Sequence, residues 1–139
     1  MIFTRRDALA AGASAIALLA ATRAAFATAA EEAIAEFTGG GAAGTGDITI
    51  KAPEIAENGN VVPVEVDAPG AAEIMIMAPA NPGPVACKVA FGPMSGSQRL
   101  STRIRLAKTQ DVTALARMAD GSFIMTSQTV KVTVGGCGG

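Results

Sequence analysis

The 139-residue sequence contains no histidine, tyrosine or tryptophan. Without histidine, neither a Ser-His-Asp nor a Cys-His catalytic arrangement can form, the commonest zinc ligand is missing, and a histidine-ligated haem is excluded. Aspartate and glutamate remain as acid-base residues, and no two of them stand together among apolar residues that would raise a carboxyl pKa. We therefore expect no catalytic residue, no metal and no cofactor, unless a cysteine does all the chemistry.

Patterns that bind nucleotides or nucleic acids are missing as well. No GxGxxG follows an expected strand, and the glycines at 39–41 have no lysine placed for a phosphate. The chain carries a net charge of −1, and residues 30–139 alone hold 8 basic and 11 acidic side chains, a net charge of −3. Because phosphate binding needs a positive surface, nucleic acid is not an expected partner.

Residues 1–29 have the pattern of an export signal. A short charged segment precedes an apolar stretch from Ala8 to Ala21, and small residues suited to cleavage occur at Ala27 and Ala29. The apolar stretch is interrupted by Gly12 and is shorter than the roughly 20 apolar residues of a membrane span. We therefore expect a cleaved signal with no membrane span.

The route of export is suggested by one pair of residues. Arg5 and Arg6 resemble the twin-arginine signal, which exports folded proteins, although Ala8 stands where that pattern prefers an aromatic residue. The alternative is an ordinary secretory signal with two basic residues. Both interpretations predict a periplasmic or otherwise extracytoplasmic protein.

The remainder of the chain has the length of one domain. Residues 30–46 are expected to form a short helix at Glu31–Phe37 and a flexible glycine-rich connector. In residues 47–134, short runs with a two-residue alternation are separated by turn residues, which predicts an antiparallel β-sandwich. The expected strands lie at 47–51, 61–67, 72–78, 85–91, 102–106, 112–119 and 122–134. In the last of them, Val130, Val132 and Val134 are expected to pack on one face. Residues 52–60 are expected to form one helical turn.

Three local patterns allow sharper predictions. Pro63 cannot donate to a strand ladder, which favours an edge strand or a bulge. Asp120-Gly121 indicates a two-residue hairpin with a type I′ turn. Arg103 and Arg105 are expected to point outward, either as a solvated face or toward an anion or an acidic partner.

The strand expected at Ala72–Ala78 is apolar on both faces. Ile74 and Ile76 face one way, whereas Met75 and Met77 face the other, so both faces need cover. The second face is either a protein interface or buried within the domain, and a copper-binding methionine pair is a third possibility.

The two cysteines differ sharply in their surroundings. Cys87 shares a strand face with apolar residues, which predicts an inert core thiol. Cys137 stands in the terminal GGCGG, where Gly135, Gly136, Gly138 and Gly139 offer no side chains to bury it. Glycines form a slender, flexible arm, so the thiol could enter a narrow pocket of another protein.

Three interpretations of Cys137 compete. The two cysteines could form a periplasmic Cys87–Cys137 disulfide within an interaction protein. The protein could be a thiol-redox enzyme, although such enzymes usually hold a CxxC pair at a helix N-terminus. Finally, the domain could carry a substrate covalently on Cys137 and present it to separate enzymes, which fits the arm best.

Three segments resemble one family in the same order along the chain. They are APEIAENGNVVPVEVD at 52–67, STRIRLAKTQDV at 101–112 and VKVTVGGCGG at 130–139. Together they are similar to SoxY, the sulfur carrier of the periplasmic thiosulfate-oxidising system. The resemblance covers nearly all of residues 30–139, and Cys87 departs from it because the pattern requires only the terminal cysteine.

The resemblance implies an immunoglobulin-like β-sandwich and a carrier that is not itself an enzyme. It implies a heterodimer with SoxZ and transient contacts with three enzymes. SoxAX, a haem enzyme, would join thiosulfate to Cys137, and SoxB, a manganese hydrolase, would release sulfate and leave a persulfide. SoxCD, where present, would oxidise the remaining sulfur. Cys137 is thereby expected to be the attachment site, and the four terminal glycines the arm.

Overall fold

The computed structural model describes residues 28–135, which form one helix at 28–38 and two β-sheets. The larger sheet has the order β1-β9-β8-β5-β6, with β3 pairing separately to β9, and the smaller sheet has the order β2-β4-β7. The strands are β1 (Ala43–Gly44), β2 (Thr49–Lys51), β3 (Ile55–Asn58), β4 (Val62–Asp67), β5 (Ala71–Met77), β6 (Val85–Ala90), β7 (Arg99–Ile104), β8 (Gln110–Met118) and β9 (Phe123–Val134). The export signal predicted at 1–29 lies almost wholly outside the described residues.

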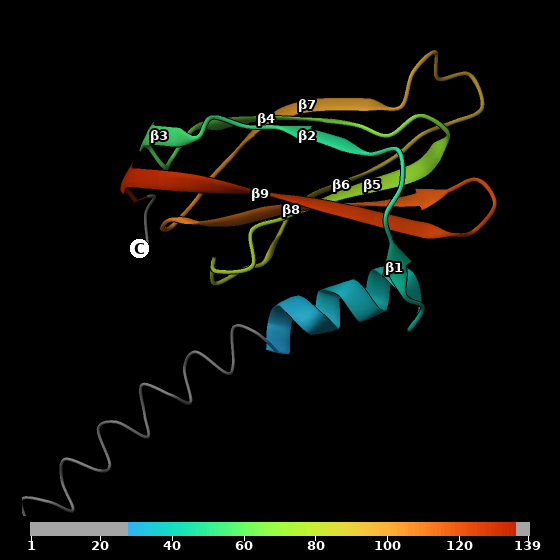
Figure 1. The fold of residues 1–139 in the computed structure, drawn as a ribbon, viewed down its shortest axis with the longest axis horizontal. Coiled ribbons are helices and arrows are strands. Elements are labelled where there is room, and N and C mark those ends of the chain that lie inside the picture. Colours follow the sequence, from blue (N-terminus) through green and yellow to red (C-terminus); the bar gives the residue numbers. More distant parts are fainter. Residues whose placement is uncertain (1–27, 136–139) are drawn as a thin grey trace, which may run out of the picture.

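The two sheets face each other, and the predicted β-sandwich is confirmed (Figure 1). The core between them is built by the period-two alternation of the strands, which places every second side chain inside. Val62, Val64 and Val66 of β4 meet Ile74 and Ile76 of β5 there. Each of these side chains is almost fully buried.

The helix at 28–38 covers the other face of the larger sheet (Figure 1). Ala30 and Phe37 of the helix pack with Met75, Met77 and Leu115. The ring of Phe37 also makes an edge-to-face contact with Phe123, with centroids 5.8 Å apart. The second apolar face of β5 is therefore buried within the domain, as one of the three interpretations of that face predicted.

Two short segments form strands that the sequence patterns did not predict. The helical turn expected at 52–60 is wrong, because β3 pairs in parallel with the end of β9. The glycine-rich connector contains β1, which also pairs in parallel with β9. All other strand pairs are antiparallel. Both unexpected strands depend on pairing with a strand far away in the sequence.

Two local predictions need correction. Pro63 was expected on an edge strand or at a bulge, but β4 is the middle strand of its sheet. β2 pairs only with Glu65–Asp67, however, so the N-terminal part of β4 that holds Pro63 has one free edge. The hairpin between β8 and β9 is not type I′, because among its turn residues only Gly121 has a positive φ. Instead, Gly121 N donates to Met118 O, and the Asp120 carboxylate accepts from the Ser122 backbone and hydroxyl.

Candidate functional site

The last strand of the fold leads directly to the predicted arm and is held on both sides. β8 flanks β9 as far as Val130, and β3 pairs with it up to Val134. Two further hydrogen bonds hold the last residues of β9. Val132 N donates to Thr109 Oγ1 at 2.9 Å, and Val134 O accepts from Gly59 N at 2.8 Å. The base of the arm is therefore anchored by backbone bonds as far as Val134.

Gly135, the first residue of the predicted arm, lies against the loop between β7 and β8. A Cβ atom built on Gly135 would overlap the backbone carbonyl oxygen of Ala107. Such an overlap with backbone cannot be relieved by turning a side chain. Gly135 is thus needed for close packing where the chain leaves the sandwich, in addition to any flexibility it provides.

A polar network holds the loop that Gly135 contacts. Asn81 donates from Nδ2 to Arg105 O at 2.7 Å, and its Oδ1 accepts from Ala107 N and from Gln110 Nε2, both at 2.9 Å. Gln110 Oε1 in turn accepts from Ala80 N at 2.9 Å. Because these partners satisfy one another's polar groups, the loop has a defined position beside the exit of the arm.

Apolar side chains are exposed at the same end of the sandwich. The sequence pattern placed Val134 with Val130 and Val132 on an anchoring face, but this is wrong for Val134, whose exposed fraction is 61%. Ile55 on the neighbouring β3 is 60% exposed, and Val61, in the turn that follows β3, is 53% exposed. The end of β9 therefore presents apolar surface to solvent.

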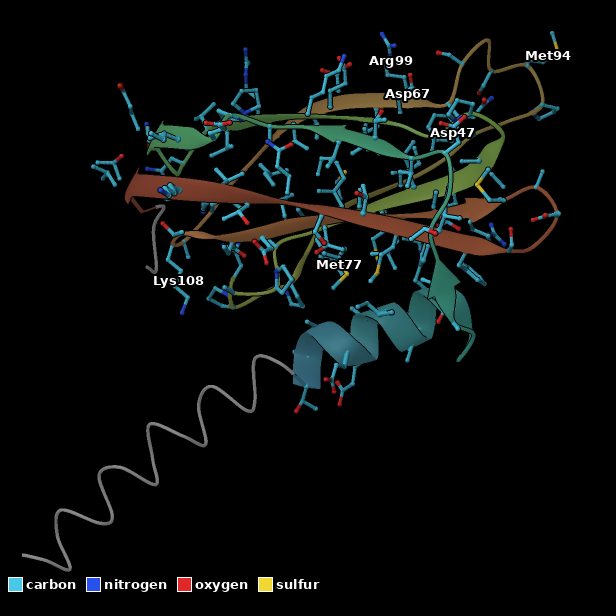
Figure 2. All side chains as sticks on the ribbon, viewed as in Figure 1. Asp47, Asp67, Met77, Met94, Arg99 and Lys108 are labelled. Atoms are coloured by element: carbon cyan, nitrogen blue, oxygen red, sulfur yellow. The ribbon has the colours of Figure 1, made fainter. Side chains whose placement is uncertain are left out.

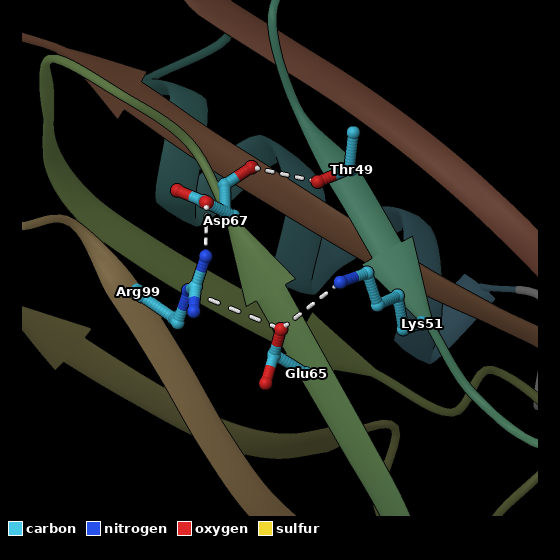
Figure 3. A network of polar contacts seen from close by, with 5 residues as sticks. All are labelled: Thr49, Lys51, Glu65, Asp67 and Arg99. Atoms are coloured by element: carbon cyan, nitrogen blue, oxygen red, sulfur yellow. Dashed lines mark hydrogen bonds and ion pairs between the residues drawn. The ribbon is translucent and has the colours of Figure 1, made fainter.

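The basic side chains fall into two groups, those that make an ion pair and those that make none. Lys51, Lys88, Arg99 and Arg117 each make an ion pair with a carboxylate. Figure 3 shows one group of these pairs, in which Arg99 binds Asp67 at 3.1 Å and Lys51 binds Glu65 at 3.5 Å. Within residues 28–135, the other four basic side chains make no ion pair: Arg103, Arg105, Lys108 and Lys131.

The structure tests only part of the predicted site. Cys137, Gly136, Gly138 and Gly139 lie outside the described residues, so the attachment site and most of the arm stay predictions. Gly135 is exposed at the end of β9, and its predicted role in a flexible arm stays a prediction. Sequence reasoning missed Asn81 and Gln110, which nothing in their local pattern distinguishes from ordinary loop residues.

Cys87 lies on β6, the edge strand of the larger sheet, with its side chain partly buried against the core. Burial raises the pKa of the Cys87 thiol, and a hydrogen bond with the backbone of Ile76 only partly offsets this effect. A raised thiol pKa leaves little thiolate at neutral pH, and the thiolate is the reactive form. The expected low reactivity of Cys87 fits this environment, but its predicted place in the core is wrong in part, because Cys87 lies on an edge strand and is only partly buried.

The register of the sheet separates Cys87 from the arm. Cys87 lies opposite Ile76, Ile76 opposite Ala114, and Ala114 opposite Thr126 of β9. Three strand spacings and the eight residues from Thr126 to Val134 give a separation of about 30 Å between Cys87 and the end of β9.

That separation is too long for a disulfide within the chain. The three residues from Val134 to Cys137 span at most about 10 Å. Bridged cysteines need Cα atoms within about 7 Å. An intramolecular Cys87–Cys137 disulfide therefore does not fit this fold.

No group of three or more metal-ligating side chains occurs among residues 28–135. No helix in that range is long and apolar enough to cross a membrane. The strongest candidate site is therefore the end of the sandwich from which the arm leaves.

A β-sandwich whose last strand is anchored to its end and continues into a short thiol-bearing segment has the design of a covalent carrier. Comparison with known proteins agrees with this class. The family model for the sulfur oxidation protein SoxY matches residues 34–137, so the chain belongs to the SoxY family. No curated protein matches the chain in a sequence search.

Solved structures give the same result. The sulfur carrier protein SoxY from Chlorobium limicola f thiosulfatophilum is 37% identical, with a TM-score of 0.66, and the match covers 78% of this chain and 99% of that one. A superoxide reductase (neelaredoxin) from Ignicoccus hospitalis is 21% identical, with a TM-score of 0.55, covering 63% of this chain and 81% of that one. At that identity the second likeness concerns the fold alone.

Proposed function

We propose that the protein carries sulfur intermediates of thiosulfate oxidation covalently on Cys137 and presents them to separate enzymes. The observation that carries the proposal is the match to the SoxY family model, which extends to residue 137 and so includes the terminal cysteine. The anchored end of β9 supports it, because a carrier needs a rigid base from which a short arm leaves. The protein itself catalyses no step.

The chemistry of the cycle requires only one thiol from this chain. In the first step the Cys137 S–H bond breaks and an S–S bond forms to the outer sulfur of thiosulfate, with one proton and two electrons released. A haem enzyme of the SoxAX type takes up the two electrons. In the second step water cleaves the bond to the sulfone, releasing sulfate and two protons and leaving a persulfide on Cys137. A SoxB-type manganese hydrolase would bind the water.

The proposed cycle takes place outside the cytoplasm. The export signal predicted at 1–29 supports a periplasmic location, reached through the twin-arginine route if the protein folds before export. SoxZ is the proposed stable partner, and SoxCD would act on the persulfide where it is present. Tethering the sulfur to one carrier replaces diffusion of reactive intermediates between these enzymes.

The proposal is tested by loading purified variants with thiosulfate in the presence of a SoxAX-type enzyme. Cys137→Ser should take up no adduct while keeping the far-UV spectrum and melting temperature of the unmodified protein, since no described core contact is lost. Cys87→Ala is the matched control, which keeps the arm and should load fully. Uptake by Cys137→Ser, or loss of loading in a folded Cys87→Ala, would contradict the assignment.

A redox role based on a Cys87–Cys137 disulfide is the weaker alternative. The separation of about 30 Å between Cys87 and the end of β9 opposes it. The raised pKa of the Cys87 thiol also makes that residue a poor partner for thiol exchange.

A further inference from the structure

The end of the sandwich from which the arm leaves has the composition of a docking surface. Its basic members are Arg105 and Lys108, on the loop that contacts Gly135, and its apolar members are Ile55, Val61 and Val134. Backbone contacts hold these segments together: Leu106 N donates to Gly59 O at 2.7 Å, and Gly59 N donates to Val134 O at 2.8 Å. We call these five residues the exit surface.

The length of the arm determines what must touch the exit surface. Cys137 is two residues beyond Gly135, and two residues span at most about 7 Å when extended. An enzyme that takes the Cys137 sulfur into a pocket must therefore bring the rim of that pocket against the end of β9. The parts of the exit surface that such an enzyme would contact first are Val134 and the loop that carries Lys108.

The charges at this end are available to a partner. Lys51, Lys88, Arg99 and Arg117 are already paired with carboxylates, whereas Arg105 and Lys108 make no ion pair among residues 28–135. Figure 2 shows Lys108 near the end of β9, while Arg99 and Asp67 lie toward the other end of the sandwich. The free cations thus concentrate where the arm leaves.

Carboxylates also occur at this end of the sandwich, but none lies on the loop between β7 and β8 that carries Arg105 and Lys108 and borders Gly135. Glu54 and Glu57 lie on the β3 side, and the Asp111 carboxylate accepts a hydrogen bond from Thr129 Oγ1. Lys108 instead follows Ala107, whose carbonyl borders Gly135. With an excess of acidic residues in the chain as a whole, this local charge is too small for nucleic acid and suits an acidic protein surface.

We propose that the exit surface docks the pocket rim of the enzymes that act on Cys137, and that this rim carries acidic side chains around an apolar contact. Exposed apolar residues flanked by charges follow the usual arrangement of a protein interface, with an apolar centre and a polar edge. The Asn81–Gln110 network already holds the loop that carries Lys108 and Arg105. Docking therefore costs little conformational entropy in the backbone of this loop. This inference rests on the proposed carrier function.

The test is the rate at which a SoxAX-type enzyme loads Cys137 with thiosulfate, measured from low to high salt. Lys108→Glu should lower kcat/KM at least about tenfold at low salt, and the deficit should shrink as salt screens the charges. Lys51→Glu makes the same charge change away from the arm and should alter the rate less than about twofold. Val134→Ser should lower the rate at every salt concentration, whereas Met94→Ser, at a residue 94% exposed in another loop, should not.

Controls separate docking from effects on the thiol or on assembly. Alkylation of Cys137 by neutral iodoacetamide should proceed at the same rate in all variants, and their melting temperatures and complex with a SoxZ-type subunit should be unchanged. Equal loading of Lys108→Glu and Lys51→Glu would overturn the inference while leaving the carrier function intact. Loss of the SoxZ-type complex in Lys108→Glu would assign the surface to a stable subunit and also overturn it. Failure of the unmodified protein to load would instead refute the carrier function.

Discussion

At the scale of single residues, Gly135 is constrained by close packing against the loop between β7 and β8. Its α-carbon lies so close to the Ala107 carbonyl that a methyl group has no space. The neighbouring atoms belong to backbone held by Asn81 and Gln110, so they cannot move without breaking hydrogen bonds. The first glycine of the arm therefore fixes where the arm begins.

We expect Gly135→Ala to lower the free energy of unfolding by about 1–3 kcal/mol, because the added Cβ forces the loop or the strand end to shift. Gly83→Ala is the control, since a Cβ at Gly83 meets no atom within 4 Å. Urea unfolding monitored by circular dichroism measures both. Equal midpoints for the two variants would show that the close approach at Gly135 has no energetic consequence.

The rate at which the Cys87 thiol reacts should depend on pH. Burial raises the pKa of this thiol in the folded protein, so the protonated form is favoured. The free energy of unfolding therefore falls as pH rises from the ordinary pKa of the thiol through the raised pKa of the folded state. At pH 7 to 8, iodoacetamide should therefore modify Cys87 much more slowly than Cys137. Peptide mass spectrometry over a pH series measures both rates. Faster modification of Cys87 in the folded protein would contradict its placement on β6.

At the scale of secondary structure, the helix at 28–38 covers the apolar outer face of β5 and β8. It explains why the sequence of β5 is apolar on both sides, since Met75 and Met77 need cover that the smaller sheet cannot give. Phe37 is the largest helix residue in this contact and is 9% exposed.

We expect Phe37→Ala to destabilise the domain by about 3–5 kcal/mol, because it removes a buried ring and leaves a cavity over the sheet. Glu36→Ala, at an exposed neighbour on the same helix, should change the free energy of unfolding by less than about 0.5 kcal/mol. Thermal unfolding compares the two variants. A similar melting temperature for both would mean that the helix contributes little to the fold.

The elements differ in how far the sequence could predict them. Strands with a local signature, such as the two-residue alternation of β4 and the short apolar run of β5, were predicted because these patterns encode their burial. β3 and β1 were not, since each is held by parallel pairing with β9, which local sequence does not reveal. The exposure of Val134 was missed for a related reason: the alternation of β9 continues past the point where the smaller sheet covers it.

At the scale of the whole molecule, the cations that are paired with carboxylates differ in position from the unpaired cations near the end of β9. The cations Arg99 and Arg117 are neutralised by Asp67 and Glu73, whereas Arg105 and Lys108 remain free beside the arm. The sequence predicted that Arg103 and Arg105 point outward, and the structure confirms their exposure. Their relation to the arm required the fold, because it depends on how the loop after β7 meets the end of β9.

The most direct test of the carrier function is peptide mass spectrometry of the protein purified without reductant from thiosulfate-grown cells. The carrier function predicts thiosulfonate, persulfide or related sulfur adducts on the peptide that contains Cys137 and none on the peptide that contains Cys87. A Cys87–Cys137 disulfide within one chain, with no adduct after reduction and reloading, would contradict both the carrier function and the strand register that separates the two cysteines.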